Sequence, residues 1–248
     1  MPPRDIFENF KKFLSDADGK FRIFEHQVPI ETQLEYFVYS NRWRELLPGD
    51  SEIEFDQLAD MLFDSTVSLD LKKKILSALA VSKEVKAFRM LQEYAQAPDK
   101  ELKDWVHMAL MESRVMLESE FTDERQIYIS SGLGGKGDRM RFYILLLSAT
   151  GNPFLDYQQQ VIEREFAFAL QKNDCEIEEL TIRTNYVELI ILAPIQTNLK
   201  RFIENIVSEC NQYGDFIANT ITITNVKKLA ENEIAQIIKK HENIRTSS

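Results

Sequence analysis

The residues best suited to bind a charged ligand lie in the stretch SSGLGGKGDR, residues 130–139. This stretch holds four of the chain's eight glycines and two cations, and a third cation, Arg141, lies two residues after its end. Glycine-rich loops bind phosphates when backbone amides and a helix N-terminus face the anion. We name residues 130–139 the glycine arm. The candidate contacts in and beside it are Gly132, Gly134, Gly135, Lys136, Gly137, Arg139 and Arg141.

The glycine arm does not match the common phosphate-binding motifs. A Walker loop needs G-x-x-x-x-G-K-[ST], but Ser130 stands at the first glycine position and Gly137 follows Lys136. That motif and the dinucleotide fingerprint also need a helix directly after the loop, whereas the strand-like run RFYILLLS follows here. Two interpretations remain. The arm is either a turn between QIYISS and RMRFYILL, or a mobile arm that receives an acidic partner or an anion.

No set of residues has the spacing of a catalytic or metal site. The three histidines, His26, His107 and His241, fall in different predicted elements and lack neighbouring ligands at metal-binding spacing. The chain contains neither G-x-S-x-G nor H-E-x-x-H. We therefore expect no catalytic residue, no cofactor and no metal, and the sequence favours a protein that is not an enzyme.

Charge and composition exclude further classes. The 248 residues carry a net charge of −10, which disfavours nucleic acids and acidic membranes as partners. Local RNA contact through Lys136, Arg139 and Arg141 is disfavoured for the same reason. No leader and no apolar run of about 20 residues is present, so we expect a soluble cytoplasmic protein. Cys175 and Cys210 fall at opposite ends of the predicted sheet, which predicts two free thiols.

The first part of the chain, residues 1–121, has helical periodicity almost throughout. Asp99 is a plausible N-cap of its last long helix. DLKKKILSALA from Asp70 aligns with ELKDWVHMALM from Glu101 at an offset of 31, with an amphipathic helix between them. This pattern resembles short HEAT-like repeats, and an ordinary helical bundle is the open alternative. Near the start, DIFENFKKFL places one apolar group on a single helical face: Ile6, Phe7, Phe10, Phe13 and Leu14.

The second part, residues 126–248, predicts a different architecture. Short β-branched runs alternate with helical segments in the order β-α-β-β-α-β, as in ferredoxin-like domains. FYILLLS and VELIILA are almost continuously apolar, so we expect them inside the sheet, whereas ELTIRT and NTITITN alternate like edge strands. The predicted elements are strand 140–148, helix 153–172, strand 177–183, strand 187–192, helix 196–211, strand 216–224 and helix 226–241. Residues 126–131 form an additional strand.

The segment from Met140 to Thr224 also resembles an ACT-type regulatory domain. Asn152 and Pro153 match the loop after the first strand of that family, and residues 173–177 loosely match its turn into an edge strand. Phe154 replaces the glycine that normally follows the proline. The resemblance implies that a small effector binds at Asn152, between paired subunits.

These observations predict an α+β protein with a helical, HEAT-like N-terminal domain and a ferredoxin-like C-terminal domain. We expect a non-enzymatic protein-binding, assembly or adaptor role, because stacked helix pairs offer an extended surface and no chemistry is visible. Threonine-rich edge strands allow a homodimer through sheet extension. The alternative is an ACT-like sensor of a small molecule or anion, which would use the Asn152 loop or the glycine arm.

Overall fold

The computed structural model describes residues 20–46, 55–122 and 126–246, and it confirms the mixed α+β class. The apolar face predicted for residues 6–14 lies outside the described residues. The chain divides into two compact units, Met1–Ser130 and Ser131–Ser248. We call them the helical unit and the sheet unit.

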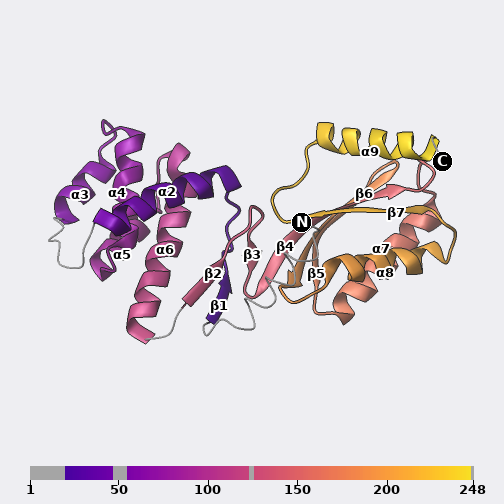
Figure 1. Ribbon diagram of the computed structural model, residues 1–248, viewed down its shortest axis with the longest axis horizontal. Coiled ribbons are helices and arrows are strands. Elements are labelled where there is room, and N and C mark those ends of the chain that lie inside the picture. Colours follow the sequence, from indigo (N-terminus) through magenta and orange to yellow (C-terminus); the bar gives the residue numbers. More distant parts are fainter. Residues whose placement is uncertain (1–19, 47–54, 123–125, 247–248) are drawn as a thin grey trace. The chain divides into compact units, whose positions relative to one another are not determined.

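The helical unit is built around one central helix (Figure 1). This helix, α4, contacts α2, α3, α5 and α6. Tyr36, Leu76, Leu91 and Trp105 are among the largest fully buried side chains of the shared core. The five helices thus enclose one shared apolar core. The helices are α2 (Ile30–Leu46), α3 (Phe55–Phe63), α4 (Leu69–Val81), α5 (Val85–Tyr94) and α6 (Lys103–Thr122).

Asp99 does not cap the last helix as predicted. A short 3-10 turn, Lys100–Leu102, precedes α6, and the Asp99 side chain makes no capping bond to it. The carboxylate instead accepts hydrogen bonds from the buried Lys72 ammonium at 2.6 Å and from the Tyr94 hydroxyl at 2.5 Å. The Asp99 carboxylate, which the sequence pattern assigns to the start of the helix, therefore binds Lys72 of α4 instead.

The additional strand predicted before the sheet belongs to the helical unit. This strand, β2 (Gln126–Ile129), pairs in parallel with β1 (Lys20–Ile23), and β2 packs on α6. Ser130 continues the connection, because its hydroxyl donates to the Gln33 side chain at 2.8 Å. The expected hairpin between residues 126–131 and the following strand is therefore wrong, since β2 has a partner at the start of the chain.

The sheet unit places the strands largely as the burial pattern predicts. β4 (Arg139–Ser148) lies between β6 (Tyr186–Pro194) and β7 (Ile217–Thr224), and β6 lies between β4 and β5 (Glu176–Ile182). The two nearly continuous apolar runs thus occupy the interior of the sheet. A two-residue strand, β3 (Gly135–Lys136), pairs with the first residues of β4.

Helices cover both faces of this sheet (Figure 1). α7 (Asp156–Lys172) and α8 (Leu199–Asn211) cover one face and enclose the larger apolar core, which includes Ile144, Phe166, Leu189 and Ile206. α9 (Glu231–Thr246) covers the other face through Leu229, Ile234, Ile237 and Ile238, which pack on Tyr143, Leu145 and Ile190. The final helix therefore covers the face of the sheet opposite to α7 and α8.

Three helix starts differ from the predictions: α8 begins at Leu199 instead of residue 196, and the other two have a visible cause. α7 begins at Asp156 instead of residue 153, because Phe154 is buried and its amide donates to the Thr184 carbonyl oxygen at 2.8 Å. α9 begins at Glu231 instead of residue 226, and the Glu233 carboxylate accepts from the Ala230 amide at 2.9 Å. In both cases a tertiary or capping contact keeps the preceding residues out of the helix.

Candidate functional site

The glycine arm packs against the connection between β7 and α9. A Cβ atom on Gly132 would lie 1.7 Å from the Val226 carbonyl oxygen, so only glycine fits there. The next residue, Leu133, is buried and its amide donates to the Asn225 carbonyl oxygen at 3.0 Å. Gly134 and Gly137 adopt positive φ angles of 66° and 61°. These four positions make the arm a fixed turn of the sheet unit.

Carboxylates on and just before β5 pair with the cations of the arm. Arg141 donates to both carboxylate oxygens of Glu178 and to the Leu133 carbonyl oxygen, and its side chain is only 14% exposed. Arg139 pairs with Asp174 at 2.6 Å. Lys136 approaches Glu176 at 3.9 Å. The positive charge that the sequence offers to an anion is thus largely balanced within the unit, and ligand contact by this arm stays a prediction.

Asn152 lies at the opposite end of β4 from the arm. A ten-residue strand is about 33 Å long, so the structure does not bring Asn152 together with the other candidate residues. The Asn152 amide donates to the Thr150 hydroxyl at 3.3 Å, and Asn152 itself is exposed. The Arg245 guanidinium, from the end of α9, donates to the Ala149 carbonyl oxygen at 3.3 Å in the same loop. This loop therefore joins β4, α7 and α9.

The site residues predicted from the sequence do not include a buried carboxylate that lies under α9. Glu188 is 8% exposed on the central strand β6, and it accepts a hydrogen bond from the fully buried Tyr143 hydroxyl at 3.0 Å. Arg183 pairs with the same carboxylate at 3.5 Å. Burial, followed by the bond to Glu188, raises the pKa of Tyr143 well above its usual value. The sequence signal that could have revealed this group is the single acidic residue, Glu188, within the apolar run VELIILA.

The three histidines do not form one site. The His26 and His107 rings stack at 3.7 Å within the helical unit, whereas His241 lies on α9 of the sheet unit. Burial lowers the pKa of both stacked histidines; for His107 the charge on His26 lowers it further. No group of three or more metal-binding side chains occurs within residues 20–46, 55–122 and 126–246.

Both cysteines are buried free thiols, which confirms the prediction. Burial is the main cause that raises the pKa of Cys210 to about 12. In the part of the chain that the structure describes, none of the helices combines the length and apolar composition of a membrane span.

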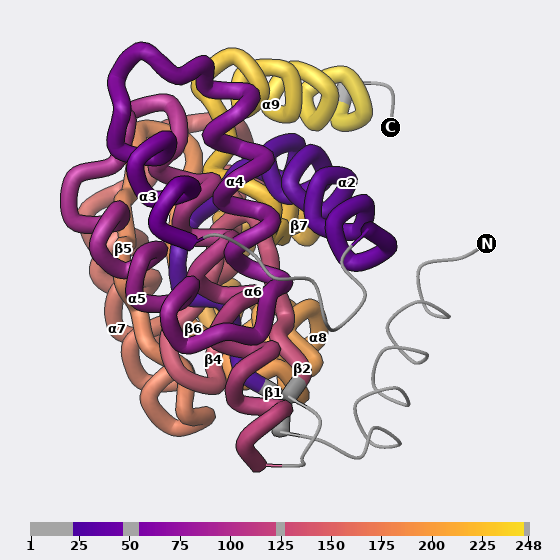
Figure 2. Tube along the Cα trace, turned by 90° about the vertical axis from the view of Figure 1, so that its left-hand side faces the viewer, coloured from indigo at the N-terminus to yellow at the C-terminus, as the bar shows by residue number. Residues whose placement is uncertain are grey.

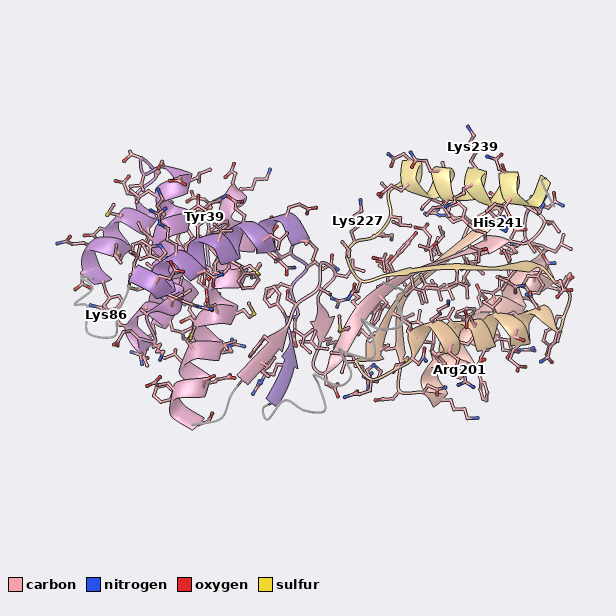
Figure 3. The ribbon with its side chains drawn as sticks, viewed as in Figure 1. Tyr39, Lys86, Arg201, Lys227, Lys239 and His241 are labelled. Carbon is pink, nitrogen blue, oxygen red and sulfur yellow. The ribbon has the colours of Figure 1, made fainter. Side chains whose placement is uncertain are left out.

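Two neighbouring lysines on α9 stand out among the surface cations. Lys239 and Lys240 are exposed, and no carboxylate among the described residues pairs with either. Figure 3 shows Lys239 on the side of α9 that faces away from the sheet, and Arg201 on α8, which covers the other face. Lys227 and Lys228, just before α9, pair with Glu233 and Glu179 at 2.8 and 2.7 Å. Among the described residues of the sheet unit, Lys172 and Arg201 are further exposed cations outside any ion pair, but only Lys239 and Lys240 are adjacent to each other.

The two units differ in charge. Residues 131–248 contain 13 Lys and Arg and 15 Asp and Glu, a balance of −2, whereas residues 1–130 contain 17 and 25, a balance of −8. Most of the chain's acidity therefore belongs to the helical unit. The net charge of the whole chain understates how readily the sheet unit can approach a polyanion.

Comparison with known proteins gives only distant structural likenesses. No protein-family model matches the chain, and no curated protein matches its sequence. A candidate transposase from Deinococcus radiodurans R1 shares 15% identity over 42% of this chain and 90% of its own, with a TM-score of 0.34. A REP-associated tyrosine transposase bound to a REP hairpin shares 8% identity over 40% of this chain and 62% of its own, with a TM-score of 0.32.

Three expectations are corrected at this point. These two solved structures are transposases, and neither supports a HEAT-like adaptor or an ACT-type sensor, so both expectations are withdrawn. One of the two is bound to a REP hairpin, and the expectation that nucleic acid is an unlikely partner is withdrawn. The adaptor relied mainly on missing motifs, the sensor on the loop resemblance at Asn152 and on the cations of the glycine arm, and the exclusion of nucleic acid on net charge.

Proposed function

We propose that the sheet unit is a ferredoxin-like module that contacts nucleic acid through the exposed face of α9. The observation that carries this proposal is the adjacent pair Lys239 and Lys240 on one exposed helix end, which no carboxylate of the described residues neutralises. Phosphate contacts by lysine and arginine supply most of the sequence-independent affinity for nucleic acids. The glycine arm is a poorer candidate, since Arg139 and Arg141 already contact carboxylates.

The surroundings of the two lysines support the same surface. The other exposed residues on this side of α9 include Asn232, Gln236 and Asn243, whose neutral side chains can bond to phosphate or sugar. The carboxylates of α9 are concentrated in its first turn, at Glu231 and Glu233, and only Glu242 lies near its end. The helix thus offers a neutral-to-basic strip to a polyanion.

The matching experiment reverses the charge of this surface. A double variant, Lys239→Glu with Lys240→Glu, is compared with a control double variant, Lys200→Glu with Arg201→Glu, which makes the same change of charge on α8 (Figure 3). Binding of a fluorescent nucleic-acid hairpin and of a single strand is measured by anisotropy at low salt. We expect the α9 variant to lose at least tenfold in affinity and the control to lose less than threefold.

Equal losses in both variants would indicate diffuse electrostatics and contradict a site on α9. Failure of the unaltered protein to bind either nucleic acid at about 50 mM salt would refute the proposal as a whole.

The two buried thiols suit a reducing compartment, and we propose that the protein acts in the cytoplasm.

A further inference from the structure

The strand β7 forms one outer edge of the sheet, and β5 forms the other (Figure 2). Among the described residues β7 pairs only with β4, so its other side carries backbone donors and acceptors without a strand partner. At the start of β7 the Asn211 side chain bonds both the amide and the carbonyl oxygen of Ile217, at 3.0 and 2.9 Å. No other described segment bonds in this way to the outer backbone groups of residues 220–224. We call residues 220–224 the open edge.

The two outer strands differ in charge. β5 carries three carboxylates, those of Glu176, Glu178 and Glu179. Charged side chains on an outer strand are a common protection against pairing with a further strand. β7, with the sequence IANTITIT, carries no charged residue. Of the two threonine-rich edges that the sequence predicts, the structure therefore leaves β7 suited to a further strand.

The side chains of the open edge are incompletely covered. The register of β7 with β4 is regular from Ile221 to Thr224. Ile221 and Ile223 pack on the larger apolar core beneath α7 and α8, yet both are only half-buried. Thr222 faces the opposite side, because it pairs with Leu145, which packs under α9. A further strand beside β7 would cover the two isoleucines and extend both layers of the unit.

We propose that two copies of the chain pair through the open edge as antiparallel strands centred on Thr222. The sequence of the open edge, TITIT, is the same in both directions. Antiparallel self-pairing therefore places residues of one type opposite each other: Thr222 with Thr222, Ile221 with Ile223, and Thr220 with Thr224. Thr–Thr pairs stabilise neighbouring strands, and no like charges meet at this two-fold interface. Self-pairing of β5 would instead bring carboxylates together.

This pairing has a consequence for nucleic-acid contact. Antiparallel pairing of two identical edges makes one continuous sheet, whose two-fold axis is perpendicular to it. The α9 helices of both copies then cover the same face of that sheet. Lys239 points away from the sheet (Figure 3), so the lysine pairs of both copies can contact one nucleic-acid molecule. This step rests on the proposed function, whereas the pairing of the strands does not.

The mass of the full chain in solution, measured by analytical ultracentrifugation, tests the pairing. Thr222→Lys is compared with Thr181→Lys, because the two threonines lie in one row of paired residues at opposite edges of the sheet. Only Thr222→Lys places two like charges opposite each other at the two-fold axis. We expect the unaltered chain and Thr181→Lys to form dimers, and Thr222→Lys to raise the dimer dissociation constant at least tenfold. A monomeric unaltered chain, or equal dissociation constants for the two variants, would overturn the proposal.

Cross-linking tests the register without a change of charge. Thr222→Cys should cross-link two copies at least tenfold faster than Thr181→Cys with a short thiol-specific reagent, and the native thiols are buried and react slowly. Equal rates would contradict pairing centred on Thr222. The proposed function is tested separately: a monomer that binds the hairpin overturns the dimer alone, whereas a dimer that binds no nucleic acid refutes the proposed function alone.

Discussion

Replacement of Glu112 by alanine should strongly destabilise the helical unit. Glu112 joins α6 to α2, because its buried carboxylate accepts hydrogen bonds from Tyr36, Ser40 and Arg44. The Tyr36 and Ser40 side chains are 0% exposed, so water cannot replace the missing acceptor. Arg44 is 43% exposed and can return to solvent at small cost.

The magnitude follows from these exposures. Each buried hydroxyl left without a partner costs about 1–3 kcal/mol. Two such hydroxyls give roughly 2–6 kcal/mol, and loss of one partner from a buried charged group typically costs about 3–5 kcal/mol. We therefore expect Glu112→Ala to lower the free energy of unfolding by about 4 kcal/mol. The free energy of unfolding of a whole domain is only about 5–15 kcal/mol.

The assay is urea unfolding followed by tryptophan fluorescence. Both tryptophans, Trp43 and Trp105, lie in the helical unit, so the signal reports that unit alone. A matched triple variant, Tyr36→Phe, Ser40→Ala and Glu112→Leu, removes the stranded hydroxyls together with the carboxylate and should recover most of the loss. A loss below about 1 kcal/mol for Glu112→Ala alone would refute the reasoning.

Three further predictions concern other parts of the chain. The pKa values of His26 and His107 are lowered in the folded state, so the unfolded state binds more protons below about pH 6.5. The urea midpoint of the helical unit should therefore fall as the pH is lowered. The variant His107→Gln should make this midpoint less dependent on pH. Gly132→Ala should prevent stable folding of the sheet unit, whereas Gly137→Ala, where a Cβ meets nothing within 4 Å, should cost only about 1 kcal/mol in chemical denaturation. Cys210, with its pKa raised to about 12, should react with a thiol reagent at pH 8 only after unfolding, and immediate stoichiometric reaction would contradict its burial.

The arrangement of the sheet could be predicted because burial leaves a direct record in apolar patterning. VELIILA is apolar almost throughout and lies between two strands, and ELTIRT alternates and lies at an edge. Among the described helices of the first half, α3 and α5 were readable in the same way from their apolar period, whereas α2 buries Gln33 and Ser40 and has no such period. These features depend on the sequence within each element alone.

The features that failed depend on partners far away in sequence. Asp99 reads as a cap until Lys72 approaches it, and residues 126–129 read as part of a hairpin until β1 pairs with them. The carboxylates of Asp174 and Glu178 beside the cations of the glycine arm were likewise not visible from spacing, although ligand contact by the arm stays a prediction. Pairing of this kind is not encoded by spacing, so the candidate site was the least predictable part.

The salt dependence of hairpin binding tests the central proposal most directly. Each phosphate contact contributes about 0.9 to the slope of log affinity against log salt concentration. Two contacts through Lys239 and Lys240 should therefore contribute a slope of about 1.8, which corresponds to roughly a 12-fold loss of affinity between 50 and 200 mM salt. We expect the charge-reversed α9 variant to lose this part of the slope while the α8 control retains it. An identical slope for the unaltered protein and the α9 variant would contradict nucleic-acid contact through α9.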